Sequence, residues 1–126
     1  MIENKNNEAR FQKNKSFAQK YHDDVVSSGR IGSDPNVSGD ITMFLTGVEI
    51  DGKEYVIPLY NPMTGKIEGD PYQMERDGEM KTFYKPTREA IERARGYIRD
   101  GLIVGYENPQ DAESDRALYY DQVVGK

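Results

Sequence analysis

The stretch V-E-I-D-G-K-E-Y-V-I-P-L-Y, residues Val48–Tyr60, contains two short apolar runs on either side of the pair Asp51-Gly52. An Asp-Gly pair in this position predicts a β-hairpin with a type I′ turn, because that turn needs a positive φ at both central residues. Two strands alone are marginally stable in water, so another element must cover the apolar face of the hairpin. The residues predicted on that face are Phe44, Thr46, Val48, Ile50, Tyr55, Ile57 and Leu59. The opposite face, with Gly47, Glu49, Glu54 and Tyr60, is expected to meet solvent.

Two helices are predicted after the hairpin. The first covers residues 88–100, with Thr87 as N-cap, one apolar face and Gly101 at the left-handed position after its end. The second covers residues 109–123, because Asn108-Pro109 reads as N-cap and first helical residue. We expect the first helix to cover the apolar face of the hairpin, with the second beside it.

The stretch between the hairpin and the helices is punctuated by turn residues. Pro58 cannot donate a ladder hydrogen bond, so its strand is expected at an edge. Asn61–Gly65 predicts a turn that leads into a short return strand at Lys66–Ile67. Residues 68–80 are interpreted as a polar loop, followed by a short strand at Lys81–Tyr84.

The fold class predicted from these elements is α+β: a small antiparallel hairpin-based sheet covered by one or two C-terminal helices, with an extended or partly helical N-terminal arm. Residues 1–40 are expected to form this arm and a linker, partly disordered or docked on a partner, and residues 41–126 the α+β domain. The arm has a narrow apolar stripe within residues 9–26, which fits either a frayed helix or a segment that orders on a partner. Residues 27–40 are rich in Gly and Ser and read as the linker.

Composition narrows the function classes. The chain has 126 residues, 31% of them charged, no Cys and a net charge of −5, so disulfides and thiolate chemistry are excluded. No apolar run reaches the roughly 18 residues of a membrane span, and no secretory signal is recognised. Residues 1–30 have a net charge of +2 and the remainder −7, which disfavours DNA as a partner of the body and leaves only the basic segment for such contact. We expect a soluble protein of the cytoplasm or of a particle assembled there.

Three residue clusters were weighed as chemical sites. The carboxylates at 111, 113 and 115 lack the glycine and terminal glutamate of a calcium loop and fit the negative charge bias of a helix start. His22 beside two aspartates has no second ligand pair in its neighbourhood. Glu49 and Glu54 face each other across the hairpin, but no base and nucleophile accompany them. We therefore expect a non-enzymatic protein without metal or cofactor.

Aromatic residues supply the remaining candidates. The chain has nine Tyr and four Phe, and Tyr is enriched both in small cores and at protein–protein contacts. Both interpretations stay open, because several of these residues flank turns. The candidate partner-binding residues are Phe17, Tyr21, Val25, Tyr60, Tyr72, Tyr84 and Tyr106.

The order Asp51-Gly52-Lys53, Ile57-Pro58, Ala90-Ile91 with Ala94, then Asp111-Ala112 resembles a small module of virion structural proteins in tailed bacteriophages, especially short-tailed, podovirus-like ones. The resemblance covers residues 46–124 and departs from the pattern at Leu59, where Thr is usual, and in the length of residues 61–85. It implies a structural role in the tail, at the portal region or inside the head of a virion assembled in the host cytoplasm. We expect the chain to dock on other virion proteins through its acidic, Tyr-rich body and its N-terminal arm. The partners would be tail, portal or capsid proteins, in several copies. The alternative is a small soluble phage or bacterial regulator that binds and modulates a host protein.

Overall fold

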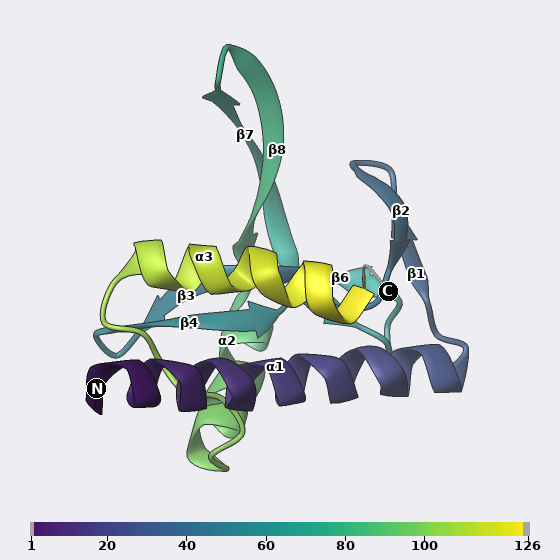
Figure 1. Cartoon of the computed structure of the whole chain (residues 1–126). Helices are drawn as coiled ribbons and strands as arrows, with labels where there is room; N and C mark the ends of the chain where they lie inside the picture. Colours follow the sequence, from purple (N-terminus) through teal and green to yellow (C-terminus); the bar gives the residue numbers. More distant parts are fainter. Residues whose placement is uncertain (1, 125–126) are drawn as a thin grey trace.

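The computed structural model describes residues 2–124 of the chain, with side chains from residue 7 onward. Within this part the chain is α+β, with helices at both ends and antiparallel two-stranded sheets between them, which confirms the predicted fold class (Figure 1). The helices are α1 (Ile2–Ser28), α2 (Arg88–Arg99) and α3 (Pro109–Tyr119), and a π-helical turn at Tyr120–Val124 extends α3. The strands are β1 (Gly32–Asp34), β2 (Val37–Ile41), β3 (Leu45–Ile50), β4 (Lys53–Pro58), β5 (Tyr60–Asn61), β6 (Lys66–Ile67), β7 (Gly69–Arg76) and β8 (Glu79–Pro86).

The hairpin β3–β4 has the predicted turn and register. Asp51 and Gly52 have φ values of 52° and 86°, as a type I′ turn requires. Val48 pairs with Tyr55, and Glu49 pairs with Glu54. The free edge of β4 is partly closed, because Glu54 exchanges two backbone hydrogen bonds, of 3.0 and 2.7 Å, with Tyr106. The hairpin is thus held both by its own turn and by the segment that precedes α3.

One face of the hairpin is covered by α2, as predicted. Tyr55 and Ile57 pack in one cluster with Ala90 and Ala94 of α2. Ala90 and Ala94 are 1% and 0% exposed, so these small side chains allow the helix to approach the sheet closely. Thr87 accepts a hydrogen bond from the Ala90 backbone N–H as the N-cap of this helix.

The opposite face of the hairpin is covered over part of its length. The expectation that it meets solvent is confirmed for Gly47 and Glu49, which are exposed, and is wrong for Tyr60, which is 1% exposed. Leu45 and Val56 on this face pack with Ala112 and Tyr119 of α3. The sheet therefore lies between α2 on one side and α3 on the other, rather than under two neighbouring helices (Figure 1). The predicted start of α3 is confirmed, because the Asn108 side chain accepts a hydrogen bond from the Asp111 backbone N–H.

Helix α1 packs along the body of its own chain. Ala18 and Val25 are each 2% exposed and belong to the hydrophobic core. The buried Asn14 side chain forms two hydrogen bonds with the Val104 backbone. Its Oδ1 accepts from the Val104 N–H at 2.8 Å, and its Nδ2 donates to the Val104 C=O at 3.0 Å. The segment expected to be an arm is therefore a long helix with extensive contacts inside the chain.

Two hairpins project from the body on the same side (Figure 1). The first, β1–β2, occupies most of the stretch expected to be a linker. The second, β7–β8, replaces the polar loop predicted over residues 68–80, and that prediction is wrong. The turn at Asp77 and Gly78 has φ values of 53° and 79°, so a second Asp-Gly pair makes the same kind of turn as Asp51-Gly52.

Candidate protein-docking site

The β7–β8 hairpin is the most exposed element of the described chain. From here on we call this hairpin the arm; the name no longer refers to the N-terminal segment, which is helix α1. Every residue from Asp70 to Lys81 is exposed to solvent. The arm has eight residue pairs in unbroken register, from Gly69 with Pro86 to Arg76 with Glu79. Eight residues in a strand extend about 27 Å at ~3.4 Å each, so the tip stands well clear of the core.

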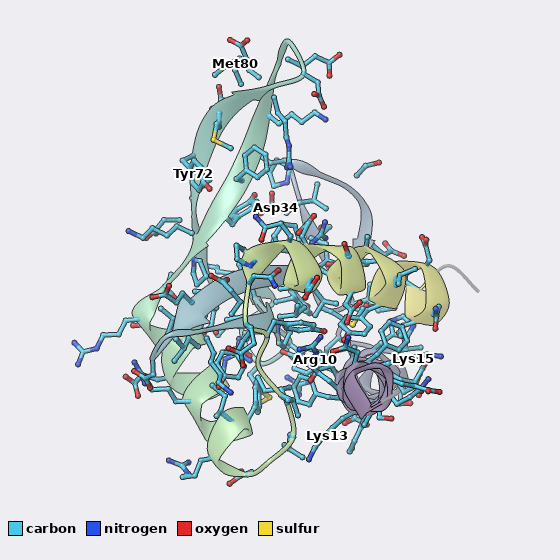
Figure 2. All side chains as sticks on the ribbon, turned by 60° about the vertical axis from the view of Figure 1, so that its left-hand side comes forward. Arg10, Lys13, Lys15, Asp34, Tyr72 and Met80 are labelled. Atoms are coloured by element: carbon cyan, nitrogen blue, oxygen red, sulfur yellow. The ribbon has the colours of Figure 1, made fainter. Side chains whose placement is uncertain are left out.

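The arm has large apolar side chains where solvent would favour polar ones. Tyr72 and Met74 are 47% and 45% exposed on one face, and Met80 is 64% exposed on the other face near the tip (Figure 2). Tyr72 stacks on its cross-strand partner Phe83 with ring centroids 5.8 Å apart. Exposed Met and Tyr side chains on a projecting element are typical of surfaces that bind proteins.

The root of the arm is fixed to the body. Gly69 leaves no room for a side chain, because an added Cβ would lie 2.8 Å from the Cβ of Tyr84. Tyr84 is buried, and its hydroxyl donates to Asp34 Oδ1 of the β1–β2 hairpin at 2.7 Å. Before the arm, Glu68 pairs with Arg93 of α2, with 2.5 Å between Arg93 Nη2 and Glu68 Oε1. The arm is therefore a long exposed ribbon on a rigid base.

A second candidate surface lies between α1 and the end of α2, and we call it the groove. It has a volume of about 460 Å³, within the range of ~300–1,000 Å³ that pockets for organic ligands occupy. The groove is lined by Lys13, Ser16, Phe17, Lys20, Tyr21, Asp24, Tyr97, Gly101 and Leu102.

Aromatic rings form the floor of the groove. The Phe17 ring lies 4.8 Å from that of Tyr97 and 6.0 Å from that of Tyr21, centroid to centroid. The hydroxyls of both tyrosines accept hydrogen bonds of 3.2 Å from Arg93, and these bonds fix the positions of the two rings. Burial raises the pKa of Tyr21, and the neighbouring Arg93 offsets part of that effect. The floor is thus aromatic and preformed.

The seven candidate partner-binding residues divide between the surface and the core. Phe17 and Tyr21 line the groove, and Tyr72 lies on the arm. The other four are at most 8% exposed and pack inside the chain, so their large side chains serve the core; these are Val25, Tyr60, Tyr84 and Tyr106.

Tyr106 also takes part in a buried hydrogen-bond network, which we call the tyrosine network. Its hydroxyl donates to Asp115 Oδ2 at 2.8 Å, accepts from Asn14 Nδ2 at 3.3 Å and lies 2.5 Å from the Tyr119 hydroxyl. The Arg10 guanidinium lies 4.2 Å above the Tyr106 ring. Tyr106 therefore connects α1 with α3 and contributes to the stability of the fold.

The side chains of the polar clusters considered as metal or catalytic sites do not converge on one point, and each contacts a different neighbour. His22 Nδ1 lies 2.7 Å from Thr42 Oγ1. Of the three carboxylates of α3, Asp111 contacts Asn108, Glu113 pairs with Arg116 at 2.6 Å, and Asp115 accepts from Tyr106. In the described residues no group of three or more His, Cys, Asp or Glu side chains is arranged to hold a metal ion.

Sequence reasoning missed several residues of these surfaces, and Met80 and Leu102 show why. Met80 lies at the end of the stretch that composition indicates as a polar loop, although Asp77-Gly78 between two runs of strand-forming residues is a hairpin signal. Leu102 is 45% exposed at the edge of the groove, and its exposure depends on how α1 packs against α2. No local pattern predicts that packing.

No protein-family model, curated protein or solved structure matches this chain. Among residues 2–124, none of the helices has the length and apolar character needed to cross a membrane.

Proposed function

We propose that this chain is a non-enzymatic structural component of a tailed-phage virion that docks on other virion proteins. The observation that carries the proposal is the arm, an exposed ribbon with Tyr72, Met74 and Met80 on a base fixed by Glu68 and Tyr84. Such a ribbon buries little within its own chain, and its apolar residues gain stability when a partner covers them.

The phage setting comes from the sequence resemblance. The residues that carry it support the fold: Ile57 is fully buried in β4, Ala90 and Ala94 contact the sheet from α2, and Ala112 contacts it from α3. A module of this kind supplies a stable base, and the parts inserted between its elements are free to differ. The arm, Gly69–Pro86, lies almost entirely within residues 61–85, where the chain is longer than the pattern, so the insertion and the docking element nearly coincide.

The partners in this proposal are tail, portal or capsid proteins. The apolar arm residues alternate with charged ones, including Glu75, Arg76 and Lys81. This mixture suits a protein surface with an apolar centre and a polar rim. The chain would be present in several copies in the virion, after assembly in the host cytoplasm.

Mass spectrometry of purified virions tests the proposal. Particles from the phage that encodes the chain should contain it at a constant ratio to the major capsid protein through successive gradient purifications. Loss of the chain during purification, while the capsid and tail proteins remain, would refute a structural role.

The groove favours a second candidate, a free regulator that binds a host protein. Its aromatic floor and the exposed Leu102 form a compact apolar site of the kind that holds a single protein segment. This candidate predicts a chain that is abundant in infected cells and absent from particles, so the same measurement separates the two.

A further inference from the structure

We propose that copies of this chain associate head to tail, with the arm tip of one copy in the groove of the next. The inference rests on the proposed function in one respect, since it takes the arm as the docking element. It goes further because it names a second copy of the chain as a partner and identifies the receiving surface.

The arm cannot fill the groove of its own chain. Figure 1 shows the arm projecting from the body on the side away from α1. In Figure 2, Met80 lies at the far end of the arm, whereas Lys13 lies on the side of α1 that faces away from α3 and the arm. The two surfaces are therefore available to different copies.

The apolar parts of the two surfaces fit each other in chemistry. Met74 and Met80 present exposed, flexible thioether side chains near the tip, one on each face of the ribbon. The groove offers the rings of Phe17 and Tyr97 and the exposed side chain of Leu102. Methionine sulfur packs favourably against aromatic rings, and its unbranched chain adapts to irregular hollows. The groove volume of about 460 Å³ is sufficient for more than one such side chain.

The charges of the two surfaces are also complementary. Around the turn, residues 74–81 hold three carboxylates, Glu75, Asp77 and Glu79, against two basic side chains, Arg76 and Lys81, so the tip has a net charge of −1. At the groove the basic residues are Lys13 and Lys20, and the acidic one is Asp24, which lies 2.8 Å from Lys20. Lys13 has its amine near the mouth, 4.0 Å from where a Cβ on Gly101 would lie. An acidic tip next to a basic rim favours this contact and disfavours pairing of two tips.

A head-to-tail contact joins two different surfaces. The first and last copies of an assembly therefore each keep one unused surface, an arm or a groove, and association continues into a ring or a filament. A contact between two arms, by contrast, would stop at a dimer. The size of the assembly and its response to mixing therefore identify the contact.

The test uses the full chain and two double variants in sedimentation velocity experiments from micromolar to millimolar concentration. The arm variant is Met74→Asp with Met80→Asp, and the groove variant is Lys13→Glu with Leu102→Asp. All four side chains are exposed, so both variants should fold, which circular dichroism and thermal melting check. The matched control is Met63→Asp, at a methionine that is 75% exposed in the turn between β5 and β6 and belongs neither to the arm nor to the groove lining.

The expected result has three parts. The full chain and the Met63→Asp control form assemblies that grow with concentration and weaken with salt. Each double variant alone associates at least about 30-fold more weakly, the factor for loss of a binding hot spot. An equimolar mixture of the two forms a 1:1 complex and no larger species, because only the intact arm of one and the intact groove of the other can meet.

Three results would overturn the inference. They are a full chain that stays monomeric over the whole range, a groove variant that still self-associates, or a mixture without the 1:1 complex. None of them bears on whether the chain is present in purified virions, so the proposed function is judged separately by that measurement.

Discussion

At the scale of single residues, the tyrosine network is centred on the Tyr106 hydroxyl. The Tyr106 hydroxyl forms hydrogen bonds with Asn14 of α1 and with Asp115 and Tyr119 of α3. It therefore links both helices to the segment between α2 and α3. Tyr106→Phe keeps the ring and its packing but leaves the half-buried Asp115 carboxylate and the buried Asn14 amide each short of one partner. We expect a loss of about 1–3 kcal/mol in the free energy of unfolding, measured by urea denaturation. Tyr72→Phe, on the arm, is the control and should change it by less than about 0.5 kcal/mol.

The buried tyrosines also predict sensitivity to alkaline pH. Burial raises the pKa of Tyr119 and of Tyr120 to about 12, from an ordinary value of 10. A raised pKa in the folded chain means that the unfolded chain ionises first. This stabilisation is therefore complete below pH 10 and is lost as the pH rises through 12. Each tyrosine contributes up to about 1.4 kcal/mol per pH unit in that window.

Melting curves between pH 8 and pH 12 check this dependence. The melting temperature should stay level up to about pH 10 and then fall steeply. Tyr119→Phe and Tyr120→Phe should each make the fall shallower. A melting temperature that declines evenly from pH 8 would show that other groups control the alkaline stability.

At the scale of elements, the two Asp-Gly hairpins differ in what surrounds them. The β3–β4 hairpin is covered on both faces, whereas the arm is exposed over most of its length. Gly52→Val and Gly78→Val introduce the same strain, about 1–2 kcal/mol, because both positions have positive φ. We expect the first to lower the stability of the whole chain by that amount. The second should mainly fray the arm, since the arm can open without exposing the core.

Thermal melting and hydrogen exchange distinguish these two effects. Gly52→Val should lower the melting temperature, and Gly78→Val should leave it nearly unchanged while exchange accelerates only within residues 70–84. Equal shifts of the melting temperature would mean that the arm unfolds together with the core.

Local signals predicted the elements that local chemistry determines. The turn at Asp51-Gly52, the N-cap at Thr87 and the Asn108-Pro109 helix start each have their cause within a few residues, and all three are confirmed. The arm was missed, although Asp77-Gly78 is a signal of the same kind. Its flanking residues are mostly polar, because neither face is buried, and the hydrophobic alternation that marks most strands is therefore weak.

The candidate site was less accessible to prediction. Phe17 and Tyr21 are predicted from the apolar stripe of a polar segment and Tyr72 as a tyrosine beside turns, and all three lie on the two proposed surfaces. Tyr60 and Tyr106 also flank turns but are buried, since segments distant in the sequence cover them. Burial of an aromatic residue beside a turn is a property of the tertiary fold and leaves no local trace.

At the scale of the whole molecule, α1 completes the core. It contributes Ala18 and Val25 to the interior and, through Asn14, holds the segment before α3. Removal of residues 1–28 should therefore abolish the cooperative thermal transition, because one side of the core becomes exposed. An arm-shortened variant, in which Asp-Gly replaces residues 73–82, should melt close to the full chain. A cooperative transition in the chain that lacks α1 would contradict this account.

The central claim is that the arm attaches this chain to a virion. Its most direct test is the incorporation of the arm-shortened variant, quantified by mass spectrometry of virions produced when the variant replaces the full chain. Tyr72 and Phe83 would flank the new turn as a directly paired couple, so the base of the arm and its contacts with the body should persist. The account predicts that the full chain is incorporated and that the folded, arm-shortened variant is absent from the particles. Incorporation of the variant at the level of the full chain would contradict it.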